Sequence, residues 1–144
     1  MVVSLLNAIS KELHNTFGDS YHYYVEDVEQ DIKKPCFTID MIQPLMRSKG
    51  KIRYDRTMPV VVHYFSDQKT NLKKDCYAIA EQAIDSLEYL PFKKTLLRGE
   101  DLSWQMIDGV LQMFVTYKFE TVQETNVEDA MEEFESHLRT GSNE

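Results

Sequence analysis

The dipeptide Asp108-Gly109 constrains the fold more than any other feature, because strand-forming apolar residues flank it on both sides. Asp-Gly supplies the two positive φ angles that a two-residue β-hairpin turn requires. This turn length sets the register, so Ile107 is predicted to lie opposite Val110, and Trp104 opposite Met113. The hairpin would have one polar and one apolar face, as in a half-buried antiparallel pair. The predicted apolar face contains Leu102, Trp104, Met106, Leu111, Met113, Val115, Tyr117 and Phe119.

A second strong pattern lies upstream, where the β-branched run at residues 58–65 precedes an amphipathic stretch at residues 72–90. The run predicts the buried part of a long strand, residues 52–65, that is central in a sheet or covered on both faces. The amphipathic stretch predicts a helix. Pro59 has no N–H, so its nitrogen must face an unpaired edge or an irregularity. Because side-chain parity is the same on both sides of Pro59, we expect a locally unpaired edge rather than a bulge.

The remaining elements complete a mixed fold. Apolar spacing predicts a first helix that Ser4 caps and Gly18 ends, then short strands at residues 21–25 and 36–41. A third helix is predicted at residues 127–138. The order helix, three strands, helix, two strands, helix predicts a single-domain α+β fold with a largely antiparallel sheet packed by helices. We expect this domain to span residues 1–125, with an amphipathic helix and a loose tail at residues 126–144.

Length and charge exclude several classes of protein. A chain of 144 residues supports one domain with a real core. Its 24 acidic and 16 basic residues give a net charge of −8, which argues against tight nucleic-acid binding because neutralising phosphates supplies most of that affinity. No apolar run approaches the ~20 residues of a membrane span. The N-terminus lacks the basic flank of a signal peptide. We expect Cys36 and Cys76 to be reduced core residues.

No catalytic constellation is visible, and we expect neither enzymatic activity nor a bound cofactor or metal. The acidic run at residues 26–31 could gather carboxylates around a hard cation, but it lacks the glycine and the distal glutamate of a calcium loop. We therefore expect a solvated acidic loop. An alternative from another class is a small Mg²⁺-dependent nuclease that would use Asp27 and Asp40 with Lys51, although nothing fixes the required spacing.

Five stretches, taken in order along the chain, carry a family resemblance. They are YVEDVEQDIKKPCF at residues 24–37, RYDRT at 53–57, HYFSD at 63–67, LLRG at 96–99 and IDGVL at 107–111. Together they resemble the small tail terminator proteins of phages and prophages of Gram-positive bacteria. The likeness covers residues 5–119, and no single motif is diagnostic. The predicted third helix lies beyond it.

The resemblance implies a structural protein of the virion, assembled in the bacterial cytoplasm, with a fold similar to the tail terminators of long-tailed phages. Such proteins form a hexameric ring that caps the finished tail tube and joins the tail to the head connector. On a contractile tail the ring would also contact the sheath. DNA would pass through the lumen without specific binding, which an acidic lining would favour. Another neck or head-completion connector is the alternative within this class.

The family offers no catalytic residues to carry over, so the expected interface residues are positional. A ring contact is heterologous and needs two different complementary patches. We expect one patch on a basic hairpin arm and the other on the acidic run; the alternative is exposed charges of little individual value. The apolar stripe of the third helix is expected to pack against a neighbouring subunit. These residues are Arg47, Lys49, Lys51 and Arg53 on the arm, Glu26, Asp27 and Glu29 in the acidic run, and Met131, Phe134 and Leu138 on the stripe.

Overall fold

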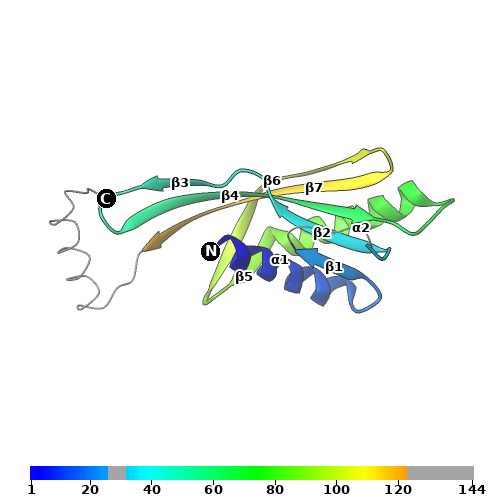
Figure 1. The fold of residues 1–144 in the computed structure, drawn as a ribbon, viewed down its shortest axis with the longest axis horizontal. Helices are drawn as coiled ribbons and strands as arrows, with labels where there is room; N and C mark the ends of the chain where they lie inside the picture. The colour runs from blue at the N-terminus through cyan, green and yellow to red at the C-terminus, as the bar shows by residue number, and fades with distance from the viewer. Residues whose placement is uncertain (26–31, 123–144) are drawn as a thin grey trace.

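The computed structural model describes residues 1–25 and 32–122, which form an α+β fold as predicted (Figure 1). The elements are α1 (Val2–Phe17), β1 (His22–Val25), β2 (Cys36–Met41), β3 (Leu45–Ser48), β4 (Arg53–Phe65), α2 (Leu72–Glu88), β5 (Tyr89–Phe92), β6 (Thr95–Ile107) and β7 (Val110–Val122). Neither α1 nor α2 is long and apolar enough to cross a membrane, and the search covered only these described residues.

The strands form one curved, largely antiparallel sheet in the order β1-β2-β4-β7-β6-β5, with β3 beside β4. Only the β1–β2 pair is parallel among the described strands. Both helices lie on the same face of the sheet (Figure 1). Residues 45–57 and 118–122, from β3, β4 and the end of β7, extend beyond the helices, on the left in Figure 1. We call this three-stranded projection the arm.

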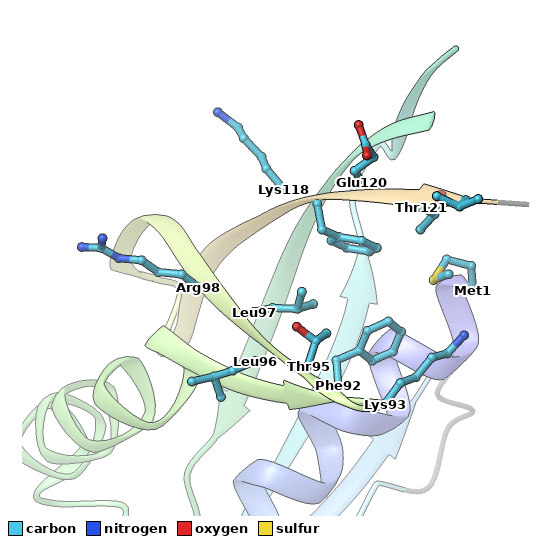
Figure 2. Close-up of a pocket in the computed structure, with 12 residues that line it drawn as sticks. Met1, Phe92, Lys93, Thr95, Leu96, Leu97, Arg98, Lys118, Glu120 and Thr121 are labelled. Carbon is cyan, nitrogen blue, oxygen red and sulfur yellow. The ribbon is translucent and has the colours of Figure 1, made fainter. Parts of the chain in front are cut away.

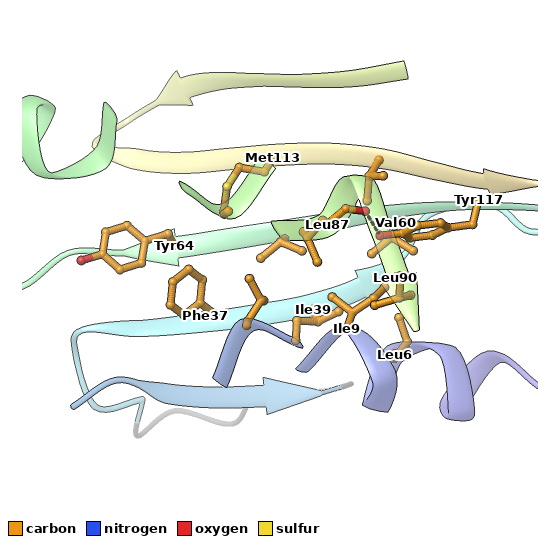
Figure 3. Packing of buried hydrophobic residues seen from close by; sticks show 14 of the residues in the cluster. Leu6, Ile9, Phe37, Ile39, Val60, Tyr64, Leu87, Leu90, Met113 and Tyr117 are labelled. Carbon is orange, nitrogen blue, oxygen red and sulfur yellow. Dashed lines mark hydrogen bonds between the residues drawn. The ribbon is translucent and has the colours of Figure 1, made fainter. Parts of the chain in front are cut away.

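The core lies between the helices and the paired strands β4 and β7 (Figure 3). Alternate residues of each strand are buried, as the predicted parity required, and β4 is a central strand, as expected. Each large apolar side chain removed from water contributes ~1.5–3 kcal/mol. The buried apolar residues of these four elements are Met58, Val60, Val62 and Tyr64 of β4, Leu111, Met113, Val115 and Tyr117 of β7, Leu5, Leu6, Ile9 and Leu13 of α1, and Cys76, Ile79, Ala80, Ala83 and Leu87 of α2.

The β6–β7 hairpin has the predicted turn and register. Asp108 and Gly109 have φ angles of 51° and 78°, and Ile107 lies opposite Val110. Trp104 lies opposite Met113 but keeps 38% of its surface exposed. Its ring packs at a tilt against Tyr77 of α2, with ring centroids 5.3 Å apart.

The strand count before and after α2 differs from the prediction. Four strands, not three, precede α2, because β3 pairs with β4 across the predicted polar turn; β3 is exposed throughout and so lacks any alternating signal. Three strands, not two, follow α2. We expected α2 to reach Leu90, because Leu90 continues its apolar stripe. The helix ends at Glu88 instead, and Leu90 is a buried residue of β5. Pro91 is tolerated because β5 is an edge strand.

Two other expectations concern the chain ends. The helix α1 begins at Val2 with Met1 as its N-cap residue, so Ser4 is not the cap, whereas Gly18 ends the helix with a positive φ of 87° as predicted. The predicted helix at residues 127–138 and the expected boundary at residue 126 lie outside the described residues.

Pro59 sits at an irregularity that belongs to the neighbouring strand. Its carbonyl accepts a hydrogen bond from the N–H of Ile42 at 2.9 Å, so its nitrogen faces the same side. On that side Met41 pairs with Val60 and Leu45 with Thr57, so three residues lie opposite two. The pairing of β4 with β7 continues across Pro59 without a shift. The local gap in pairing beside Pro59 was expected. It coincides with one extra residue in the connection between β2 and β3, opposite β4.

The C-terminal end of α2 is locked onto the sheet by a hydrogen bond and a close approach. The buried Tyr117 hydroxyl donates to the Leu87 carbonyl at 2.6 Å (Figure 3). Beside it, a Cβ added at Gly99 would lie 2.6 Å from Val115 Cγ2 and 3.0 Å from the Leu87 carbonyl oxygen. Only glycine at this position lets the helix end approach β6 so closely.

Both cysteines are free, buried thiols, as predicted. Burial raises the pKa of Cys36 and of Cys76 above the ordinary value.

Replacing Tyr117 with Phe tests this lock. The variant Tyr117→Phe leaves the buried Leu87 carbonyl without its donor, and we expect the free energy of unfolding to fall by about 1–3 kcal/mol. The control Tyr77→Phe removes an exposed hydroxyl and should change it by less than about 0.5 kcal/mol. Urea denaturation of both variants gives the comparison. Equal losses would contradict a specific role for the Tyr117 hydroxyl.

Tyr23 makes stability sensitive to alkaline pH. Its hydroxyl donates to the Gly18 carbonyl at 2.8 Å, and burial, with Tyr21 and Asp19 nearby, raises its pKa from 10.0 to about 12. Below pH 10 its contribution to stability is complete. As pH rises from 10 to about 12 the unfolded chain loses this proton first, so the free energy of unfolding falls. In urea titrations across this window, Tyr23→Phe should show a shallower decline than the parent protein; parallel declines would contradict the assignment.

Candidate functional site

The arm presents two strand edges that have no partner among the described residues. On one side, β3 pairs only with β4. On the other, β7 is paired with β6 only as far as Tyr117, which lies opposite Gly99, so residues 118–122 pair with β4 alone. Unpaired edges expose backbone donors and acceptors to other chains. The arm therefore offers two open strand edges for contact with another chain.

A bulge in β6 accompanies the opening on the β7 side. The register shifts between Glu100 and Ser103, and Asp101 has a positive φ of 54°. Bulges bend a strand and increase its twist. On the far side of Gly99, the first residues of β6, Thr95 to Arg98, pair with β5 instead of β7.

A groove of about 700 Å³ lies between this β7 edge and the β5–β6 turn (Figure 2). We call it the edge groove. Apolar side chains from the N-terminal residue and from β5, β6 and β7 line it: Met1, Phe92, Leu96, Leu97, Phe119 and Val122. Three cations belong to its lining: Lys93 extends beside Met1, and Arg98 and Lys118 extend outward at the other end (Figure 2). A smaller hollow of about 310 Å³ under the arm shares Met1, Thr121 and Val122 with it.

The cations of the edge groove have few anionic partners. Lys118 has a distant contact with Glu100, at 3.9 Å. Within residues 1–25 and 32–122, Lys93 and Arg98 form no ion pair, and they lie instead over the rings of Phe92 and Tyr89. No sequence pattern predicted this groove. The one available signal was Leu96, an apolar residue between Pro91 and Gly99 that is 59% exposed in the fold.

The structure places the four basic residues predicted for an interface on the arm, where all are exposed. Two of them already have partners. Lys49 Nζ lies 3.1 Å from a Glu120 carboxylate oxygen and 3.7 Å from Asp55, and Arg53 lies 4.0 Å from Glu120. The hydrogen bond to Glu120, with the nearby Asp55 charge, raises the pKa of Lys49 above its ordinary value. Neither Arg47 nor Lys51 forms an ion pair with a described residue.

The other predicted interface residues lie outside the described ranges. They are Glu26, Asp27 and Glu29 of the acidic run and Met131, Phe134 and Leu138 of the expected third helix.

The acidic charge of the chain is concentrated in the two segments outside the described ranges. Of the 24 acidic residues, four lie in residues 26–31 and seven in residues 123–144. Of the 16 basic residues, only Arg139 lies in either of these two segments. Residues 1–25 and 32–122 therefore carry 13 acidic and 15 basic side chains. The body of the domain is slightly basic, although the whole chain has a net charge of −8.

Two of the three residues of the nuclease alternative lie far apart, and the third, Asp27, lies outside the described residues. Asp40 pairs with Val61, whereas Lys51 lies in the turn before Arg53, roughly 26 Å away along β4. Among the described residues, no group of three or more His, Cys, Asp or Glu side chains could hold a metal ion.

The most enclosed carboxylate contact has a structural role. Asp75, in the first turn of α2, accepts hydrogen bonds from Tyr64 at 2.8 Å and Ser66 at 2.6 Å. Burial, with the Asp75 contact, raises the pKa of Tyr64 well above its ordinary value. This contact joins the start of α2 to the end of β4.

The ion pairs on the arm yield a direct test. In Glu120→Gln the largest cause of the raised Lys49 pKa is removed, so that pKa should fall toward its ordinary value. Stability should change little, because exposed ion pairs contribute little to it. NMR titration of the Lys49 side chain measures the shift, with Glu100→Gln as a control that leaves Lys49 unaffected. An unchanged Lys49 pKa in Glu120→Gln would contradict the contact.

Comparison with known proteins identifies the family. A search of curated proteins finds no match. The family model described as phage tail terminator protein matches residues 4–129, slightly more than the likeness seen in the sequence. The match covers all of the described strands and all of the described helices except the first two residues of α1, and it ends at the start of the expected third helix. The chain therefore belongs to the phage tail terminator protein family, whose members are structural components of the phage tail.

Proposed function

We propose that this protein forms a ring, with six subunits as the expected number, that caps the completed tail tube and joins it to the head connector. The observation that supports this proposal is a family match across residues 4–129 in a chain whose arm extends beyond its helical layer (Figure 1). Within a monomer, the open edges and exposed charges of a projecting arm add little to stability. In a ring, the arm can reach an adjacent subunit.

The ring contact is proposed to be electrostatic and heterologous. Closed rings use two different patches on each subunit. The arm supplies cations, and the acidic run with Glu26, Asp27 and Glu29 supplies the opposite charge. Of the four basic residues predicted for the interface, Lys49 and Arg53 already contact Glu120. The other two, Arg47 and Lys51, remain available to a neighbouring subunit. These two are the primary contact residues of the proposal.

The further partners follow from this position in the virion. The ring would contact the tail tube protein on one side and the head connector on the other, and the sheath where the tail is contractile. DNA would pass through the lumen without specific binding. Assembly takes place in the cytoplasm of a bacterial host, proposed to be Gram-positive, before the tail joins the head. Residues 126–144 are proposed to act as a separate appendage of the domain.

Charge reversal on the arm tests the ring contact. The double variant Arg47→Glu/Lys51→Glu should sediment as smaller species than the parent protein at low salt, and should cap fewer isolated tail tubes in electron micrographs. The matched control Lys73→Glu/Lys74→Glu reverses two exposed cations on α2 and should form normal rings. Rings of unchanged size and abundance in the arm variant would overturn the proposed contact.

The parent protein tests the assignment itself. Binding to tube ends supports a tail terminator. Binding to the connector or portal without binding to tube ends would overturn it in favour of another neck protein.

A further inference from the structure

We propose that the edge groove is the binding site for the C-terminal segment, residues 123–144, of a neighbouring copy of this chain. This inference rests on the proposed ring and specifies a second contact within it. Apolar side chains and three cations line the groove, and Lys93 and Arg98 form no ion pair with a described residue. The segment has the complementary properties.

The charges of groove and segment are opposite. Residues 123–144 contain seven acidic side chains and one basic side chain: Glu124, Glu128, Asp129, Glu132, Glu133, Glu135 and Glu144 against Arg139. The edge groove offers Lys93, Arg98 and Lys118. Its one acidic residue, Glu120, is already engaged by Lys49 and Arg53. The groove is therefore net positive toward an incoming acidic chain.

The apolar surfaces also correspond. Val127, Met131, Phe134 and Leu138 follow one another at steps of four, three and four residues, which places them on one face of a helix. The groove exposes Leu96 by 59%, Val122 by 48% and Met1 by 38%. Binding the stripe here removes apolar surface from water on both sides of the contact.

The lengths match as well. Residues 118–122 of β7 span roughly 13 Å, at about 3.3 Å per residue. A helix over residues 127–138 would span ~18 Å, at 1.5 Å per residue. One helix of this length covers the whole unpaired part of β7, and covering an open edge with a helix is a common way to protect it.

The direction of β7 indicates that the segment comes from a neighbouring copy. β7 runs from Lys118 to Val122 along the groove, and the chain leaves the groove at the Val122 end. To occupy its own groove the segment would have to reverse direction within a few residues. A segment that continues onward reaches an adjacent subunit, and the groove and the segment then form the two different patches of a heterologous contact.

Disulfide trapping between full-length chains tests the proposal. One protein carries Leu96→Cys in the groove and a second, differently tagged, carries Ala130→Cys, which would flank the apolar stripe on the helix of the segment. The native thiols of Cys36 and Cys76 are buried and do not compete. After mixing and oxidation with oxidised glutathione, we expect a disulfide between the two tagged chains. The matched control pairs Ala130→Cys with Tyr77→Cys, an exposed position on α2 at the other end of the sheet, and should give at most background product.

Charge reversal in the groove provides a second readout. Adding Lys93→Glu/Arg98→Glu to the Leu96→Cys protein should reduce the trapping yield several-fold at low salt. Lys73→Glu/Lys74→Glu should leave the yield unchanged. High salt should lower the yield of the parent pair, because it screens exposed charges.

Each outcome bears on the proposal. Trapping between chains that is specific to Leu96→Cys supports it. A disulfide that forms only within one chain, in the double variant Leu96→Cys/Ala130→Cys, would overturn the assignment to a neighbouring copy. Equal yields with Tyr77→Cys would overturn the groove as the binding site. Electron microscopy of the same samples separates this result from the proposed function. Rings on tube ends without disulfide trapping would reject only the segment contact. Disulfide trapping without rings would reject only the tail-capping proposal.

Discussion

The structure depends on the antiparallel pairing of β4 with β7, which continues without a break from Arg53 opposite Val122 to Tyr64 opposite Leu111. One half of this ladder, from Met58 onward, lies over the helices and supplies much of the core. The other half extends past them and becomes the arm. Because the arm and the core share the same two strands, the position of the arm is set by core packing. A surface that must meet neighbours at a defined angle benefits from this continuity.

The sequence was most informative where a local pattern and the tertiary environment agreed. Asp108-Gly109 predicted both turn and register, since a two-residue hairpin leaves no other pairing. The alternation in residues 58–65 predicted a central strand because one face is truly buried. Exposed β3 has no such alternation, and Leu90 fits the stripe of α2 as well as it fits a strand. In both cases the deciding partner is a distant strand that local spacing does not reveal.

The candidate site was predictable only in part. Clustered cations at residues 47–53 marked a basic turn, and the structure places it at the end of an arm. The internal contacts of Lys49 depend on Glu120, which lies 71 residues away in sequence. The edge groove forms where the pairing partner of β6 changes, along the chain, from β5 to β7. No periodic pattern in the sequence predicts this change of partner. Net charge was a poor guide to the surface, because the excess acid lies in two short segments and the body is slightly basic.

The unpaired stretch of β7 also matters for the protein before assembly. A free strand edge can template the addition of identical strands and lead to disordered aggregates. On this edge Lys118 and Glu120 alternate with Phe119 and Thr121. In a parallel, in-register stack of identical edges, Lys118 would face Lys118 and Glu120 would face Glu120, and like charges directly opposite each other are destabilising. Under the proposed assembly, the edge would resist this self-stacking and would still accept a chemically different partner.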